Sequence, residues 1–221
     1  MSVRSIGMSH WGLTGQIASG KADNADFESS LERDFYLLLE FDRNVARFEP
    51  QPCEIRYQAI DKAQRTYVPD VLVEYRRDFD PARGMPHELC EVKYRADLRE
   101  HWIRYRPKFR AAVKYARERG WRFRIRTEVE IRTPYLANAR FLLRYREWRW
   151  DEGIETALLD RMALFRETDA QTLVASFFWD PWKQAELLPH VWRLVATRQL
   201  GADLTAQLTM TSRIWTLGDM P

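Results

Sequence analysis

Two short apolar runs that carry acidic side chains constrain this 221-residue chain more than any other feature. One run contains Asp70, and the other contains Glu91-Val92-Lys93. Their length and composition predict β-strands. Because successive side chains of a strand point to opposite faces, Glu91 and Lys93 share one face while Val92 points into the core. If the two strands are neighbours, two carboxylates and one ammonium group converge on a single point.

These groups suit the hydrolysis of phosphodiester bonds. Mg²⁺ prefers hard oxygen ligands and keeps several waters. Asp70 and Glu91 would supply two carboxylate ligands, and the Val92 carbonyl is a candidate third. The metal would activate a water molecule, and Lys93 would hold that water and meet the charge that grows on the phosphate oxygens. The motifs therefore predict a nuclease that uses Mg²⁺, or Mn²⁺ as a substitute, with two ions per site.

A purely structural interpretation competes with this one. Pro-Asp at the start of a strand and Glu-x-Lys on a strand are both common, and cross-strand Glu–Lys pairs often only decorate a sheet. Either motif alone favours the structural interpretation. Together, in this order, on adjacent predicted strands and after an acid-bearing helix, they favour the catalytic one.

The acid-bearing helix is predicted over residues 26–41. Glu32 lies at the border of its apolar stripe, where a carboxylate needs a partner, and a metal ion is one. Ser29-x-x-Glu32 also fits a capping box, which would make Glu32 a helix-start residue. Glu28 lies on a similar bearing around the helix. Spacing alone therefore leaves Glu28 and Glu32 open as metal ligands.

An α/β domain is predicted over residues 26–133. Its first two strands, expected at 53–57 and 66–75, pair as a hairpin around a polar turn. Pro107 is expected in the first turn of the next helix, which ends at Gly120. The other elements are a strand at 89–93, the helix at 107–119 and a strand at 121–131. Residues 1–25, rich in Gly, Ser and Ala, are expected to be an arm that orders only on a partner.

Residues 134–221 are predicted to form a second, mainly helical domain. A capping-box pattern at Thr168-x-x-Gln171 begins one of its helices. The other helices are expected at 136–150, at 154–165 and through 191–200, and two short strands at 203–208 and 213–217. Several helices followed by a pair of strands predict a winged-helix-like domain.

The charge pattern favours a nucleic-acid partner. The net charge is only +3, but arginine far outnumbers lysine, and the arginines crowd between Arg95 and Arg149. The bidentate guanidinium fork suits phosphate groups, so a local basic band is typical of nucleic-acid binding. A solvated basic face is the competing interpretation.

The sequence also bears on the compartment. Cys53 and Cys90 lack a metal-knuckle spacing and are expected to be free thiols in a reducing cytosol. The four histidines show no zinc-ligand spacing. The first residues do not combine a basic segment with an uninterrupted apolar stretch, so no signal peptide is expected, and no segment has the apolar length of a membrane span. We expect a cytoplasmic protein.

Four motifs together resemble the TnsA family of transposon-end endonucleases. The segment FESSLERDFYLLLEFD at residues 27–42 resembles the opening helix of that family, and QP at 51–52, YVPD at 67–70 and EVK at 91–93 follow in the family's order. The resemblance covers about residues 27–131. In the C-terminal part only the helical, winged-helix-like pattern agrees.

The resemblance implies a restriction-endonuclease-like core, which is a mixed sheet flanked by helices, and a role in cut-and-paste DNA transposition. Members hydrolyse the 5′ strand of double-stranded DNA at transposon ends, while a DDE transposase, TnsB, cuts and joins the 3′ ends under an AAA+ ATPase regulator, TnsC. The family's catalytic residues fall on Glu32, Asp70, Glu91 and Lys93. The resemblance thus places Glu32 above Glu28 as the acid of the helix.

The basic residues that follow Lys93 then acquire a use. They would flank the active groove and bind phosphates without reading sequence. These residues are Arg95, Arg99, Arg104, Arg106 and Lys108. Trp102 and Tyr105 lie among them and are expected to anchor a helix to the sheet. Five tryptophans of the second domain are expected in its core or in a protein-docking surface: Trp148, Trp150, Trp179, Trp182 and Trp192.

Two other functions remain open from the sequence. A stand-alone PD-(D/E)xK repair or restriction nuclease would use the same chemistry but cut DNA unaided. A catalytically inactive DNA-docking adaptor would keep the fold, and its acids would only satisfy one another. The intact lysine and all three acids favour an active enzyme over the adaptor.

Overall fold

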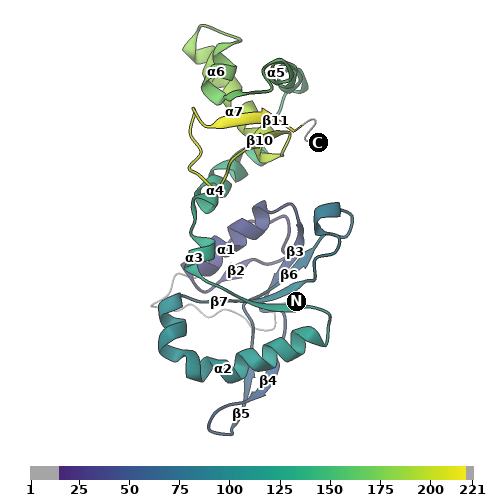
Figure 1. Ribbon diagram of the computed structural model, residues 1–221, viewed down its shortest axis with the longest axis vertical. Coiled ribbons are helices and arrows are strands. Elements are labelled where there is room, and N and C mark those ends of the chain that lie inside the picture. The colour runs from purple at the N-terminus through teal and green to yellow at the C-terminus, as the bar shows by residue number, and fades with distance from the viewer. Residues whose placement is uncertain (1–14, 218–221) are drawn as a thin grey trace. The chain divides into compact units, whose positions relative to one another are not determined.

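The computed structural model describes residues 15–217, and the chain divides into two compact units, Met1–Arg132 and Thr133–Pro221. The core of the first unit is a four-stranded sheet with the order β3-β6-β7-β8 (Figure 1). Its strands are β3 (Val45–Pro50), β6 (Val71–Tyr75), β7 (Glu88–Val92) and β8 (Arg122–Arg126). The pairs β3–β6 and β6–β7 are antiparallel, and β7–β8 is parallel. The predicted α/β class and mixed sheet are confirmed.

Two helices cover the two faces of this sheet. Helix α1 (Ser30–Phe41) packs its apolar stripe against Val71, Val73, Cys90 and Val92. Helix α2 (Arg95–Arg117) packs against the residues that alternate with them. These residues include Leu72 and Leu89, with Ala112 and Ala116 of the helix. Both faces of the central strands are therefore buried, which explains why β6 and β7 are largely apolar runs.

The predicted hairpin differs from the structure because residues 66–75 are not one strand. Strand β5 (Gln64–Tyr67) pairs with β4 (Ile55–Gln58) as a separate two-stranded sheet. Strand β6 begins only at Val71 and pairs with β3, a strand that the sequence pattern did not predict. Pro69 lacks an N–H group and cannot continue a ladder, so the chain leaves one sheet and enters the other at Pro69-Asp70.

Helix α2 begins twelve residues before the predicted start at Pro107, which lies inside it. Its first amide is satisfied by a residue distant in sequence, because Arg95 N donates to Glu128 Oε2 at 2.9 Å. Proline inside a helix removes one hydrogen bond and favours a bend, and the helix turns partway along its length (Figure 1). The strand predicted at 121–131 ends at Arg126, because a capping box at Thr127 and Glu130 begins the short helix α3 (Glu128–Ile131).

The N-terminal segment contacts the domain at several points within residues 15–25. Strand β1 (Gly15–Gln16) pairs with β2 (Asp26–Phe27), and Ala25 is buried in the core under α1. Phe48 N of β3 donates to the Lys21 carbonyl at 3.0 Å. The expected arm therefore does not extend over residues 15–25, and its residues 1–14 lie outside the described residues. A short 3₁₀ helix, η1 (Asp80–Ala82), lies between β6 and β7.

As far as residue 217, the second unit combines four helices with a three-stranded antiparallel sheet. The helices are α4 (Pro134–Arg146), α5 (Glu152–Phe165), α6 (Ala170–Ala175) and α7 (Pro181–Ala196). The sheet has the order β10 (Leu200–Ala202), β11 (Arg213–Thr216), β9 (Glu167–Asp169). Thr168 lies in β9, and Asp169 caps α6 in its place. A winged-helix-like arrangement of this unit stays a prediction.

The strand predicted at 203–208 is a loop. The buried side chain of Asn138 in α4 binds this loop at three points, since its Nδ2 donates to the carbonyls of Leu204 at 2.9 Å and Ala206 at 2.7 Å. Its Oδ1 accepts from Leu208 N at 2.9 Å. These bonds satisfy backbone groups that a strand partner would otherwise satisfy.

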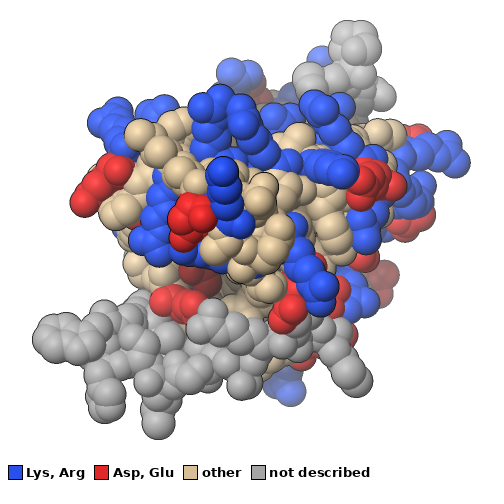
Figure 2. All heavy atoms as spheres, turned by 90° about the horizontal axis from the view of Figure 1, so that it is seen from below, with Lys and Arg blue, Asp and Glu red and all other residues tan. Residues whose placement is uncertain are grey.

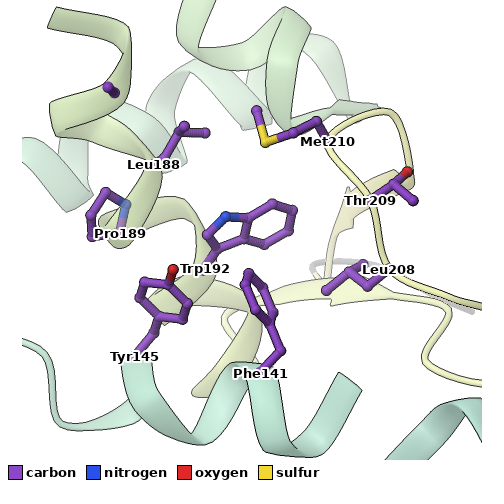
Figure 3. Close-up of a pocket in the computed structure, with 9 residues that line it drawn as sticks. Phe141, Tyr145, Leu188, Pro189, Trp192, Leu208, Thr209 and Met210 are labelled. Carbon is purple, nitrogen blue, oxygen red and sulfur yellow. The ribbon is translucent and has the colours of Figure 1, made fainter. Parts of the chain in front are cut away.

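An apolar cavity of about 450 Å³ lies between α4, α7 and this loop (Figure 3). Trp192 stands at its centre, and its ring meets Phe141 edge-on at 5.4 Å between centroids. The other lining residues are Tyr145, Ala185, Leu188, Pro189, Leu208, Thr209 and Met210. Of the five tryptophans considered above, Trp192 is buried, whereas Trp179 and Trp182 are 100% and 83% exposed. No helix within residues 15–217 combines the length and the apolar character that crossing a membrane would require.

The two thiols of the chain lie in different surroundings, which predicts different reactivity. Cys90 is fully buried, and burial, followed by the Glu88 carboxylate, raises its pKa to about 12. Cys53 is only partly buried, although burial raises its pKa as well. Because the thiolate is the reactive form, we expect a disulfide reagent at pH 8 to titrate Cys53 alone in the folded protein and both thiols in denaturant. A Cys53→Ala variant that still reacts when folded would contradict this.

Candidate active site

Three side chains of the predicted site lie together on one side of the central sheet. Asp70 immediately precedes β6, Glu91 lies in β7, and Lys93 follows the end of β7. Lys93 Nζ is 3.8 Å from Asp70 Oδ2 and 3.7 Å from Glu91 Oε1. One ammonium group therefore stands between two carboxylates, which is the convergence that the strand alternation predicted.

Asp70 is held in place by backbone groups. Its Oδ2 accepts from Val92 N at 2.6 Å, and its own N–H donates to the Cys90 carbonyl at 3.1 Å. Burial, and then the nearby Glu91 carboxylate, raise the pKa of Asp70 well above its ordinary value. Lys93 and the Val92 N–H act in the opposite direction without cancelling the rise. The protein surroundings therefore favour the protonated form of Asp70 over the ionised form.

Glu91 is 0% exposed, and both of its carboxylate oxygens have partners. Oε1 accepts from Lys108 Nζ at 2.8 Å, and Oε2 accepts from the Tyr67 hydroxyl. A buried carboxylate without partners would be strongly unfavourable. The bonds from Lys108 and Tyr67 offset the cost of burying the Glu91 carboxylate. They also fix the plane of the carboxylate.

Lys93 carries its charge at neutral pH. Burial opposes the charged form, but the carboxylates of Asp70, Glu91 and Glu32 outweigh it and raise the pKa of Lys93 above its ordinary value. The side chain is 28% exposed, so part of it is open to solvent. It is therefore a cation that a ligand from solution can approach.

Glu32 lies in the first turn of α1, which packs on the other face of the sheet. Its carboxylate accepts hydrogen bonds from residues just before the helix. Its Oε1 accepts from the Ser29 hydroxyl at 2.8 Å, and its Oε2 accepts from Glu28 N at 2.9 Å. Ser29 in turn caps the helix by accepting from Glu32 N, so α1 starts at Ser30 rather than near residue 26. Burial raises the pKa of Glu32, while these hydrogen bonds and Lys93 lower it. The hydrogen bonds of Glu32 are therefore those of a helix-start residue. The role of Glu32 as a metal ligand stays a prediction.

Glu28 is directed elsewhere. Its Oε1 accepts from Gln51 Nε2 at 3.1 Å. Gln51 has a positive φ of 48°, and its N–H donates to the Asp70 carbonyl at 2.9 Å. Gln51 of the QP motif, directly after β3, thus binds the backbone of Asp70, and Glu28 in turn binds the Gln51 side chain.

Comparison with protein families identifies the domain that holds these residues. Residues 42–128 match a family model described as TnsA-like endonuclease N terminal. The chain carries a TnsA-like endonuclease domain. The match includes Asp70, Glu91 and Lys93, and it begins after Glu32. No curated protein matches the chain. The mixed sheet of the TnsA-like domain, with a helix on each face, fits a restriction-endonuclease-like fold.

The basic residues predicted to bind DNA fall into two groups in the TnsA-like domain. Four of them lie on α2 with exposed side chains: Arg95, Arg99, Arg104 and Arg106. Lys108 instead points inward to Glu91. Trp102 and Tyr105 contact the ring of the buried Phe109 of the same helix at 6.0 and 5.7 Å between centroids. Their expected role as anchors of the helix to the sheet stays a prediction.

Sequence reasoning assigned no site role to Tyr67 and a different one to Lys108. A signal for Lys108 was present, because Lys108, Ala112 and Ala116 recur at intervals of four and share one face of a helix. A lysine on the buried face of a helix needs an acidic partner. Tyr67 gave no comparable signal, because its contact with Glu91 depends on how β5 meets β7.

The donor set of the TnsA-like domain fits one Mg²⁺ ion. Proteins hold Mg²⁺ through one or two carboxylates plus substrate phosphates, and Asp70 and Glu91 already converge on one cation, the Lys93 ammonium. Within residues 15–217, no three His, Cys, Asp or Glu side chains are grouped so that they could hold a metal ion by themselves. The Val92 carbonyl as a third ligand, and a second ion, which would depend on Glu32, stay predictions.

Proposed function

We propose that this chain is the endonuclease subunit of a heteromeric transposase, and that it hydrolyses the 5′ strand at transposon ends in a Mg²⁺-dependent reaction. One observation carries the proposal: inside a TnsA-like endonuclease domain, Lys93 stands between the carboxylates of Asp70 and Glu91. These are the groups that phosphodiester hydrolysis requires.

The side chains divide the chemistry among them. Asp70 and Glu91 would hold the metal, which supplies an activated water and neutralises charge on the scissile phosphate. The charged Lys93 ammonium donates hydrogen bonds to a phosphate oxygen and stabilises the charge that grows there. Water adds to phosphorus and the bond to the 3′ oxygen breaks. The products are a 3′-hydroxyl and a 5′-phosphate.

The charge distribution of the domain supports duplex DNA as the substrate. Lys and Arg side chains dominate the face of the first unit that carries α2 and the β4–β5 hairpin (Figure 2). The exposed arginines at 95, 99, 104 and 106 lie on the helix that follows Lys93 directly. Contacts of this kind bind phosphates without reading base sequence. The end sequence would therefore be read by the partner subunits.

The remaining assignments rest on the family. A TnsB-type DDE transposase would cut and join the 3′ ends, and a TnsC-type AAA+ ATPase would regulate both subunits. The second unit, with the exposed Trp179 and Trp182, would contact the regulator and DNA. Exposed aromatic side chains are typical of docking surfaces.

The test is strand-specific cleavage of end-labelled donor DNA by the purified protein, with and without the partner transposase, in Mg²⁺ and in EDTA. We expect 5′-strand nicks that require both Mg²⁺ and the partner. Cleavage without any partner would support the stand-alone nuclease instead. No cleavage under any condition, together with retained DNA binding, would support the inactive adaptor.

A further inference from the structure

Lys108 makes the tightest ion pair in the site, although it lies on a helix outside the acidic motifs. Its Nζ is 2.8 Å from Glu91 Oε1, and its side chain is only 15% exposed. Lys93 Nζ, by comparison, is 3.7 Å from the same oxygen. The shorter distance is that of a charge-assisted hydrogen bond, and the longer one is not. Glu91 is therefore bonded to Lys108 and only faces Lys93.

Three aromatic rings surround the Lys108 ammonium. Its Nζ lies 4.6 Å from the ring centroids of Tyr67 and Tyr105 and 5.1 Å from that of Phe109. Cations at these distances from ring faces are attracted by the ring quadrupole, more so when water is excluded. Tyr67 takes part twice, because its hydroxyl also donates to Glu91 Oε2. The cage and the carboxylate thus form one buried unit.

This unit has a consequence for Lys93. Lys108 and Tyr67 each bond one oxygen of Glu91 and so hold the carboxylate in a position where its Oε1 is 3.7 Å from Lys93 Nζ, beyond hydrogen-bond distance. Each oxygen keeps a second lone pair for a metal ion. The distance from Lys93 Nζ to Asp70 Oδ2, 3.8 Å, is also too long for a hydrogen bond. Lys93 therefore keeps its charge through the surrounding carboxylates while its donors stay available to a phosphate.

On the basis of the proposed nuclease function, we propose that Lys108 is a positioning residue of the active site: it locks Glu91 and thereby keeps Lys93 free to act on the substrate. It does not contact DNA phosphates, which is the role that its sequence neighbours Arg104 and Arg106 suit. Outer-shell groups that orient a ligand typically affect activity by about 10- to 100-fold.

The two roles predict opposite kinetic effects for Lys108→Met, which keeps the length of the side chain and removes its charge. A positioning role lowers kcat by about 10- to 100-fold and leaves the KM for DNA within about twofold. It also leaves the Kd for DNA, measured without divalent metal, unchanged. A phosphate-contact role raises KM and Kd, leaves kcat unchanged and reduces the salt dependence of binding by about one counterion.

Three further variants complete the experiment. Lys108→Arg keeps the positive charge and is expected to recover most of the lost kcat. Tyr67→Phe keeps the aromatic ring, removes only the hydroxyl from Glu91 Oε2, and is expected to lower kcat without changing Kd. Lys114→Met is the matched control, because this lysine lies on the same helix with its side chain 81% exposed and is expected to behave as wild type. Thermal unfolding of each variant verifies that it folds.

The outcomes separate this inference from the proposed function. Wild-type cleavage combined with an unchanged kcat in Lys108→Met overturns the positioning role alone, whether or not DNA binding weakens. If Lys108→Met does not fold, Tyr67→Phe decides in the same way. A wild-type protein that does not cut with its partners and Mg²⁺ overturns the proposed function, and the inference falls with it.

Discussion

Asp70→Asn is expected to abolish 5′-strand cleavage, lowering its rate by about 10³-fold or more, and to leave a folded protein that is at least as stable as wild type. Cleavage is lost because the amide replaces a carboxylate at the point where Glu91 and Lys93 converge. The fold is kept because the amide oxygen can still accept from Val92 N, as Asp70 Oδ2 does. Cleavage of labelled donor DNA and thermal unfolding measure the two effects.

The stability effect has a defined pH dependence. Folding raises the pKa of Asp70 above its ordinary value of 3.8, so the ionised carboxylate destabilises the folded state. The stability advantage of Asp70→Asn should therefore be absent below about pH 3.8, grow as the pH rises towards the raised pKa of Asp70, and be largest above it. Asp78→Asn is the control, because Asp78 is exposed and the pKa of its carboxyl is lowered by a hydrogen bond from Arg76. An Asp70→Asn variant that nicks DNA at the wild-type rate would contradict the catalytic assignment.

Gly201→Ala is expected to cause the largest loss of stability in the second unit. Gly201 in β10 lies opposite Trp215 in β11, and a Cβ atom at this position would be 2.2 Å from Trp215 Nε1 and 2.4 Å from Cε2. The indole ring lies where the new methyl group would be, so the strands must separate or the ring must leave. Overpacking of this kind costs about 1–3 kcal/mol in unfolding free energy, and we expect the upper end of that range here. Urea denaturation measures the loss.

Gly84→Ala provides the comparison for this substitution, because no atom lies within 4 Å of the Cβ position there. It is expected to change stability by no more than about 0.5 kcal/mol. Combining Gly201→Ala with Trp215→Ala should recover part of the loss, because the two residues are in direct contact and their effects are not additive. Equal stability of Gly201→Ala and wild type would show that the β10–β11 pair is not as tightly packed as described.

Local patterns predicted the parts of the fold and of the site that depend on neighbours in sequence. Alternation along one strand placed Glu91 and Lys93 on one side. The apolar stripe predicted helix α1 over residues 26–41, and its observed start at Ser30 follows the Ser29 cap of the alternative interpretation. The start of α2 could not be read in this way, because Glu128, 33 residues away, accepts from its first amide. Helix-start rules consider only the residues next to the helix, so they selected Pro107.

The partners of Glu91 were missed for a related reason. Lys108 and Tyr67 are 17 and 24 residues from Glu91 in sequence, and their contacts form only when α2 and β5 pack on the sheet. The basic character of the segment 95–108 suggested DNA binding for every member. Burial distinguishes Lys108 from its exposed neighbours, and burial depends on tertiary structure.

Strand β8 is an edge strand of the sheet β3-β6-β7-β8, and its arginines protect that edge. An edge strand offers unpaired backbone groups to any other chain. Arg122 and Arg124 project exposed side chains from this edge, and Arg126 pairs with Glu88 on the neighbouring strand. A second copy that approached in register would bring like charges together. The arginines that make the domain basic thus also oppose aggregation through the exposed edge of the sheet.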